Sequence, residues 1–134
     1  MKLVFVDTSG FYAFLDRTDP FHDKAKNLFV RARDEKWRLL TTSYVVHESW
    51  ALIQARLGWE AVEDWLGSLL PLCEVEWVDE TLHRLGSARA RQAKERGLSL
   101  TDCVSFEVMS ASGCSEAIAD DEHFRKSGCV LPPA

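Results

Sequence analysis

The chain has 134 residues, of which 46% belong to the hydrophobic set, and a formal net charge of −5. This length and apolar content predict one folded domain over residues 1–134 and argue against a disordered chain. No apolar run approaches the ~20 residues that a membrane span needs, and residues 1–9 do not resemble a secretion signal. We therefore expect a soluble, cytoplasmic protein that does not enter a membrane.

The four cysteines do not point to a metal site or to disulfides. None of them stands in a Cys-x-x-Cys spacing; they are Cys73, Cys103, Cys114 and Cys129. In a cytosolic chain of this size they are expected to be reduced residues of the core, and their spacing gives no support to a zinc site.

The first half of the chain alternates predicted strands with predicted helices. In chain order these are a strand at 2–6, a helix at 8–16, a helix at 20–36, a strand at 38–42 and a helix at 43–57. The apolar run at 2–6 is too short for a helix and is typical of a buried strand. Thr18-Asp19-Pro20 predicts the start of the second helix, because a capping side chain precedes a proline at the first helical position.

The same alternation continues in the second half. The predicted elements are a helix at 59–70, a strand at 73–78, a helix at 80–96, a helix at 101–112, a strand at 116–119, a helical turn at 121–126 and a last short strand at Val130. Asp79 is expected to cap the helix at 80–96 and Gly97 to end it. Strands that alternate with helices predict an α/β fold, with a parallel sheet and helices on both of its faces.

Asp7 directly follows the first predicted strand. Ligands of parallel sheets bind beyond the carboxyl ends of the strands, so this position favours a functional role. The alternative is that Asp7 caps the helix that follows, although Thr8 and Ser9 are equally suited to that task.

Glu48 stands in the middle of a predicted helix among apolar neighbours. The residues three and four positions away are Tyr44, Val45, Ala51 and Leu52. This pattern places Glu48 on the stripe that faces the core, where an unpaired carboxylate is costly. A metal ion, a basic partner or a raised pKa would compensate; the alternative is a solvent-exposed edge of the stripe.

Two further acidic positions lie at element boundaries. Asp102 opens a predicted helix, and Ser99 three residues earlier fits a capping box, which is a structural alternative to a functional role. Asp120 and Asp121 follow the strand at 116–119; one of them is expected to cap the next turn and the other to be free for chemistry.

Taken together, these acidic residues indicate a metal site. Carboxylates that converge on one crevice repel one another unless a cation lies between them. A set of oxygen ligands without paired His or Cys selects a hard ion such as Mg²⁺ or Mn²⁺. The most common task of such a cluster is metal-assisted phosphoryl or phosphodiester chemistry.

Four segments resemble a known family in their order along the chain. They are Asp-Thr-Ser at 7–9, Ser-Tyr-Val-Val-His-Glu at 43–48, Leu-Ser-Leu-Thr-Asp-Cys-Val-Ser-Phe at 98–106 and Ala-Asp-Asp-Glu-His-Phe at 119–124. Together they resemble PIN-domain ribonucleases, and most of all the VapC-type toxins of bacterial and archaeal toxin–antitoxin pairs. The resemblance spans essentially the whole chain, and its third segment is the most specific.

The resemblance implies a three-layer α/β/α fold with a central parallel sheet of four to five strands. It implies a metal-dependent endoribonuclease that cleaves single-stranded RNA and whose catalytic and metal-binding residues are Asp7, Glu48, Asp102 and Asp121. Asp121 is preferred to Asp120 because the family acid usually stands three residues before a Phe, here Phe124. Ala119 stands where the family often has Thr or Ser.

The implied reaction is hydrolysis that leaves a 5′-phosphate and needs no 2′-hydroxyl. The metal ion, Mg²⁺ or Mn²⁺, supplies Lewis acidity, and Asp102 or Asp121 orients the attacking water or accepts its proton.

Two basic runs are candidates for RNA contact in an otherwise acidic chain. Residues 84–96 hold five basic side chains and one acidic one, and residues 24–38 hold six and two. Within the first run we expect RNA contacts from Arg89, Arg91, Lys94 and Arg96. Solvated helix faces are the alternative for both runs.

Partners and other functions complete the expectations. The resemblance implies a cognate antitoxin and a homodimer. The tryptophans at 50, 59 and 65 suggest the predicted helices at 43–57 and 59–70 as the contact surface; the alternative is that these tryptophans are core residues. The alternatives are a phospho-acceptor signalling domain that binds Mg²⁺, a PIN nuclease for RNA processing that is not a toxin, and a binding module without catalysis.

Overall fold

The computed structural model describes residues 1–132 and contains a parallel sheet with the strand order β3-β2-β1-β4. The strands are β1 (Leu3–Val6), β2 (Arg38–Thr42), β3 (Cys73–Glu76) and β4 (Glu116–Ile118). All neighbouring strands pair in parallel, and a parallel bridge joins Glu116 to Val130, where the sequence predicts a last short strand. The predicted sheet is therefore confirmed.

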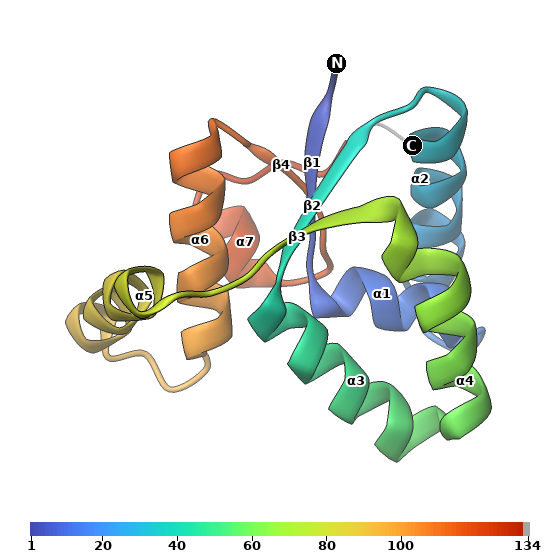
Figure 1. Cartoon of the computed structure of the whole chain (residues 1–134), viewed down its shortest axis with the longest axis horizontal. Helices are drawn as coiled ribbons and strands as arrows, with labels where there is room; N and C mark the ends of the chain where they lie inside the picture. Colours follow the sequence, from blue (N-terminus) through green and yellow to red (C-terminus); the bar gives the residue numbers. More distant parts are fainter. Residues whose placement is uncertain (133–134) are drawn as a thin grey trace.

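Helices cover both faces of this sheet. They are α1 (Thr8–Leu15), α2 (His22–Asp34), α3 (Ser43–Leu57), α4 (Trp59–Asp64), α5 (Glu80–Ala93), α6 (Leu100–Ser112) and α7 (Glu122–Lys126). Figure 1 shows α1, α2 and α4 on one side of the strands and α5, α6 and α7 on the other, with α3 below the carboxyl ends of the strands. The three-layer α/β/α prediction is confirmed. No helix within residues 1–132 has the length and apolar character to cross a membrane.

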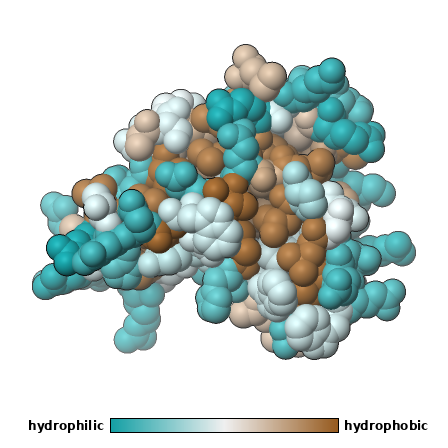
Figure 2. Space-filling model, in the orientation of Figure 1, coloured by the Kyte–Doolittle hydropathy of each residue, from teal (hydrophilic) through white to brown (hydrophobic). Residues whose placement is uncertain are grey.

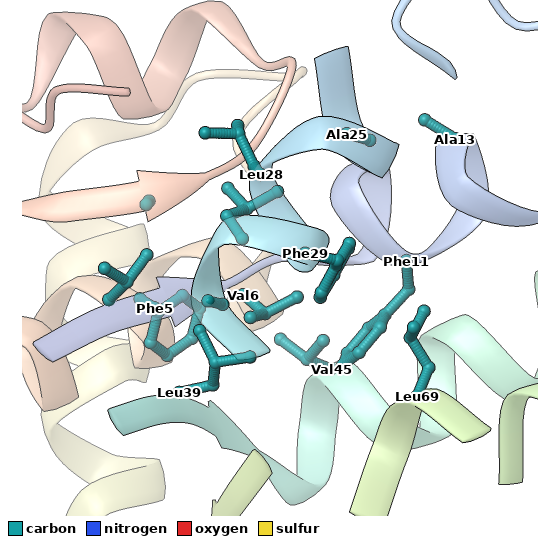
Figure 3. Packing of buried hydrophobic residues seen from close by; sticks show 14 of the residues in the cluster. Phe5, Val6, Phe11, Ala13, Ala25, Leu28, Phe29, Leu39, Val45 and Leu69 are labelled. Carbon is teal, nitrogen blue, oxygen red and sulfur yellow. The ribbon is translucent and has the colours of Figure 1, made fainter. Parts of the chain in front are cut away.

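The core is built around β1. Its residues Val4, Phe5 and Val6 are completely buried, as expected for a central strand that is covered on both faces. Figure 3 shows buried side chains of α1, α2, β2 and α3 close to this strand; they include Phe11, Leu28, Phe29, Leu39 and Val45. Because β1 is central, the residue that follows it lies in the middle of the carboxyl edge of the sheet.

The predicted start of the second helix is wrong. α2 begins at His22 rather than at Pro20, because acidic side chains stabilise turns in the preceding segment. The Asp16 carboxylate accepts hydrogen bonds from the backbone and hydroxyl of Thr18, and the Asp19 carboxylate accepts one from the backbone N–H of Phe21. These local bonds compete with the helical conformation.

Two helix ends also differ from the prediction. α5 ends at Ala93 because Lys94 adopts a left-handed conformation, with φ 49°, and its N–H bonds to the carbonyl of Ala90. Gly97 does not end this helix; it leaves room for His123, whose Cε1 atom would lie 3.3 Å from a Cβ at this position. The predicted helix at 59–70 is α4 followed by a π-helical turn at Trp65–Leu69 and a 3₁₀ turn at Leu70–Leu72.

Candidate active site

A cavity of about 420 Å³ opens at the carboxyl ends of the strands. Four elements of the fold bring the predicted acids to it: the residue after β1, the middle of α3, the first turn of α6 and the segment after β4. All four predicted site residues line this cavity, as do two more acids; the full set is Asp7, Asp19, Glu48, Asp102, Asp120 and Asp121. Among residues 1–132, Arg56 is the one basic side chain in its lining.

Asp7 both caps α1 and forms part of the cavity wall. Its Oδ2 atom accepts a hydrogen bond from the Ser9 hydroxyl at 2.8 Å and a longer one from the Ser9 N–H at 3.4 Å. Its Oδ1 atom is buried and has no hydrogen-bond partner within the described chain. Burial raises the pKa of Asp7 to about 7; the bonds from Ser9 oppose this rise, and the charges of Asp102 and Glu48 add to it.

Asp102 likewise helps to cap a helix and interacts electrostatically with the other acids of the cavity. It forms the predicted capping box: its N–H donates to Ser99 Oγ at 3.0 Å, and its Oδ2 accepts from the Ser99 N–H at 3.2 Å. Burial raises the pKa of Asp102, and the charges of Asp121 and Glu48 act in the same direction against the bonds from Ser99. Capping and membership of the acidic cluster are therefore compatible here.

Glu48 lies beside the core-facing stripe of α3, not on it. The buried residues of this helix are Val45, Ser49 and Ile53, whereas Glu48 is half-buried. The expectation of a core position is wrong, because the buried stripe of α3 passes one residue away from Glu48. Its carboxylate reaches the cavity instead, together with Arg56 two helical turns further along the same face.

The side chains of Asp120 and Asp121 have different surroundings in the structure. The Asp121 carboxylate caps α7 by accepting the His123 N–H at 2.7 Å, and it also lies 3.2 Å from His123 Nδ1. Ligand atoms of Asp102, Asp121 and His123 lie within 4.8 Å of one another. The Asp120 side chain is half-exposed and lies 3.9 Å from Arg125. This geometry supports Asp121 as the fourth acid, and the same residue provides the cap.

Three residues of the site were missed by sequence reasoning. His123 fixes Asp121 and places its Nε2 3.5 Å from the Glu95 carboxylate. Ser9 donates to Asp7 and accepts the N–H of Asp120 at 2.9 Å, and so supplies a hydroxyl next to Ala119. The third is Arg56, whose spacing of two turns from Glu48 was the available signal.

The residues present fit a hard divalent cation. The cavity offers carboxylate oxygens, and Asp7 Oδ1 is a buried acceptor without a donor among residues 1–132, which is costly unless a cation is bound. Mg²⁺ and Mn²⁺ prefer such oxygen ligands, and the His123 imidazole lies beside Asp102 and Asp121.

The two basic runs differ in the structure. In the run at 24–38, ion pairs engage Arg31, Arg33 and Arg38. In the run at 84–96, Arg84 pairs with Glu80, and Arg89 pairs with Glu107 and lies over the Phe106 ring. The exposed residues Arg91, Lys94 and Arg96 have no ion pair within residues 1–132, and the segment that holds the last two leads into Gly97 and Ser99 of the cavity wall.

The comparisons with known proteins place similar sequences and folds among VapC proteins. The 23S rRNA-specific endonuclease VapC20 of Mycobacterium tuberculosis is 31% identical over 129 residues, which is 96% of each chain. The crystal structure of that sarcin–ricin loop cleaving toxin matches with a TM-score of 0.86 and 30% identity, over 98% of this chain and 99% of the toxin. VapBC2 from Rickettsia felis, bound to a promoter DNA fragment, matches with a TM-score of 0.67 over 96% of both chains; at 13% identity this shows the fold alone.

The family model for the PIN domain matches residues 4–128, a stretch that includes the seven α-helices of the described chain, nearly all of the sheet and the acidic residues of the cavity. With a nuclease relative aligned over nearly the whole length as well, this chain belongs to the PIN-domain family.

Proposed function

We propose that this protein is a Mg²⁺- or Mn²⁺-dependent endoribonuclease that cleaves single-stranded RNA and acts as the toxin of a toxin–antitoxin pair. The observation that carries the proposal is the convergence of Asp7, Glu48, Asp102 and Asp121 on one cavity. There the buried Oδ1 atom of Asp7 lacks a hydrogen-bond partner within the described residues. The relationship to a 23S rRNA-specific endonuclease supports RNA as the substrate.

The four acids share one task in this proposal, and some residues of the cavity have a further one. Asp7, Glu48, Asp102 and Asp121 hold the ion, which supplies Lewis acidity at the scissile phosphate and makes water more acidic. Asp102 or Asp121 orients the attacking water and accepts its proton. His123 holds the Asp121 carboxylate in place through its backbone N–H and its ring. The Arg56 guanidinium offsets charge on the RNA phosphates at the rim of the cavity.

RNA contact beyond the cavity is assigned to the basic segment that borders it. Arg91, Lys94 and Arg96 are exposed and belong to the segment that leads into the cavity wall. Arg89 was predicted with them, but its guanidinium is already held by Glu107 and the Phe106 ring, so its contribution would be smaller.

A protein partner is proposed for the surface of α3 and α4. Trp65 is completely buried and is a core residue, whereas Trp59 is 56% exposed and packs edge-on against the half-buried Trp50. An exposed indole of this kind is typical of protein interfaces. We propose that the antitoxin or a second copy of the chain covers it, and that the pair acts in the cytoplasm.

Cleavage assays test the proposed function. Purified protein is incubated with an unstructured RNA and with a sarcin–ricin loop hairpin, in Mg²⁺, in Mn²⁺ or in EDTA. The expected result is cleavage that needs the metal and that is lost in Asp102→Asn, a variant that keeps a capping side chain. Undiminished cleavage in EDTA would contradict the metal site.

The alternative of a phospho-acceptor domain receives no support from the cavity. Such a domain needs a lysine opposite the acidic pocket, and no lysine lines the cavity within residues 1–132.

A further inference from the structure

A second cavity, of about 550 Å³, adjoins the acidic one. The two share Glu48 as a wall residue, and Thr101 of the second cavity is followed in the chain by Asp102 of the first. Within residues 1–132 its lining is Ser43, Tyr44, His47, Glu48, Trp77 and Thr101. Its volume lies within the roughly 300–1,000 Å³ that is usual for small-molecule sites. A group bound here would therefore lie next to the proposed point of cleavage.

Trp77 is the most unusual residue of this cavity. Its side chain is 74% exposed although the backbone around it is held in place. The next residue, Val78, donates its N–H to Ser43 Oγ at 2.9 Å, and Asp79 caps α5. Trp77 thus follows β3 at the same edge of the sheet as the acidic cluster, and the fold presents a large flat ring there.

A second aromatic residue of the lining, Tyr44, is held in place by a neighbour. The Tyr44 hydroxyl lies 2.6 Å from His83 Nδ1, and the two rings pack edge to face with centroids 5.9 Å apart. Around these rings the lining offers hydroxyls of Ser43 and Thr101 and the exposed imidazole of His47. Figure 2 shows hydrophobic residues reaching the surface on the face where β3 and α3 lie in Figure 1.

The charge of the lining narrows the choice of ligand. Glu48 is its one carboxylate, and no Lys or Arg of residues 1–132 lines it, so a phosphate group finds no cationic partner there. An uncharged planar group with hydrogen-bonding edges fits flat aromatic walls and neutral donors. A nucleobase has this chemistry, and base stacking on aromatic side chains is a general means of holding single strands.

We propose that this cavity binds a nucleobase of the RNA, stacked on the Trp77 indole, one or two nucleotides from the scissile phosphate. This inference rests on the proposed function. Continuity of the two cavities through Glu48 favours RNA as the occupant over a second copy of the chain. With a net charge of −5 the protein attracts phosphates weakly, so that stacking contributes affinity that charge does not.

The test compares Trp77→Ala, Trp77→Phe and a control, Leu85→Ala, whose exposed apolar side chain lies outside both cavities. For each, kcat and KM are measured on a short RNA that the parent cleaves in Mg²⁺, and on copies that carry one abasic nucleotide at successive positions around the cleaved bond. The molar mass in solution is measured at the assay concentration, and melting curves verify folding.

We expect Trp77→Ala to raise KM by roughly 5- to 150-fold, the range of one lost base stack, with kcat little changed. Trp77→Phe should retain most of the affinity, and Leu85→Ala should match the parent. One abasic position should raise KM in the parent by a similar factor and have no further effect in Trp77→Ala. That loss of additivity would identify the stacked base.

Three results would overturn the inference. The first is an unchanged KM in Trp77→Ala, and the second is an equal response of parent and variant to every abasic position. The third is a fall in molar mass in Trp77→Ala, which would assign the cavity to a second copy of the chain. Absence of metal-dependent RNA cleavage by the parent would instead refute the proposed function, and with it the ligand assigned here.

Discussion

Replacing Asp7 with Asn distinguishes a metal ligand from a structural acid. Asn keeps the size of the side chain and an oxygen that can accept the Ser9 hydroxyl, and it caps helices as well as Asp does. The substitution therefore removes one buried charge and little else. Without metal, that charge is unfavourable, because it is buried and lies near Asp102 and Glu48.

The magnitude follows from the pKa of Asp7. A rise from 3.8 to about 7 corresponds to on the order of 4 kcal/mol of penalty on the ionised form. Because the folded-state pKa lies above the unfolded one, the metal-free parent has its full stability below pH 3.8 and loses this contribution as pH rises to about 7. The variant does not lose it, although its amide leaves an unpaired donor that costs about 1–3 kcal/mol.

We therefore expect the metal-free variant to be about 1–3 kcal/mol more stable than the parent at pH 8, and no more stable than the parent at pH 4. Mg²⁺ at 100 times its Kd should stabilise the parent by about 2.7 kcal/mol and the variant much less. RNA cleavage by the variant should fall by orders of magnitude.

The measurements are denaturant unfolding at both pH values, with and without Mg²⁺, beside the cleavage assay. Asp120→Asn is the control, since its half-exposed side chain lies near Arg125. If Asp7→Asn cleaved RNA like the parent and gained the same stability from Mg²⁺, Asp7 would not be a ligand. If the metal-free variant were less stable than the parent at pH 8, the charge of Asp7 would have a favourable partner, and the electrostatic reasoning would be wrong.

Asp121→Asn should weaken Mg²⁺ binding, measured by calorimetry, and reduce cleavage by an order of magnitude or more, whereas Asp120→Asn should change both by about twofold at most; the reverse ranking would exchange their roles. Neutralising Arg91 and Lys94 together should reduce the slope of log RNA affinity against log salt concentration by ~1.4 for single-stranded RNA. An unchanged slope would show that this segment is a solvated helix face without RNA contacts. Gly10→Ala should destabilise the fold by about 1–3 kcal/mol in denaturant unfolding, because the new Cβ would overlap the backbone carbonyl oxygen of Ile118 in β4. An unchanged free energy of unfolding would show that β4 can shift.

Local signals in the sequence determined the order of strands and helices and the burial of the first strand, and they predicted the chemical type of the site. The apolar run at 3–6 needs no partner to be recognised as a buried strand, and Asp7 follows it directly. The capping box of Ser99 and Asp102 is local as well, since both hydrogen bonds close within four residues. Such features depend on neighbours in the chain, and these are visible in one sequence.

Tertiary structure alone decided how the side chains of distant segments meet. Asp121 and His123 come within ligand distance of Asp102 only because α7 packs beside the start of α6. Whether Glu48 lies on the buried stripe depends on which face of α3 is packed against the rest of the fold. Gly97 lies next to His123 because α5 ends at Ala93, three residues before the end that Gly97 predicts. These contacts arise from packing between elements, where burial and sterics outweigh the local preferences that a sequence displays.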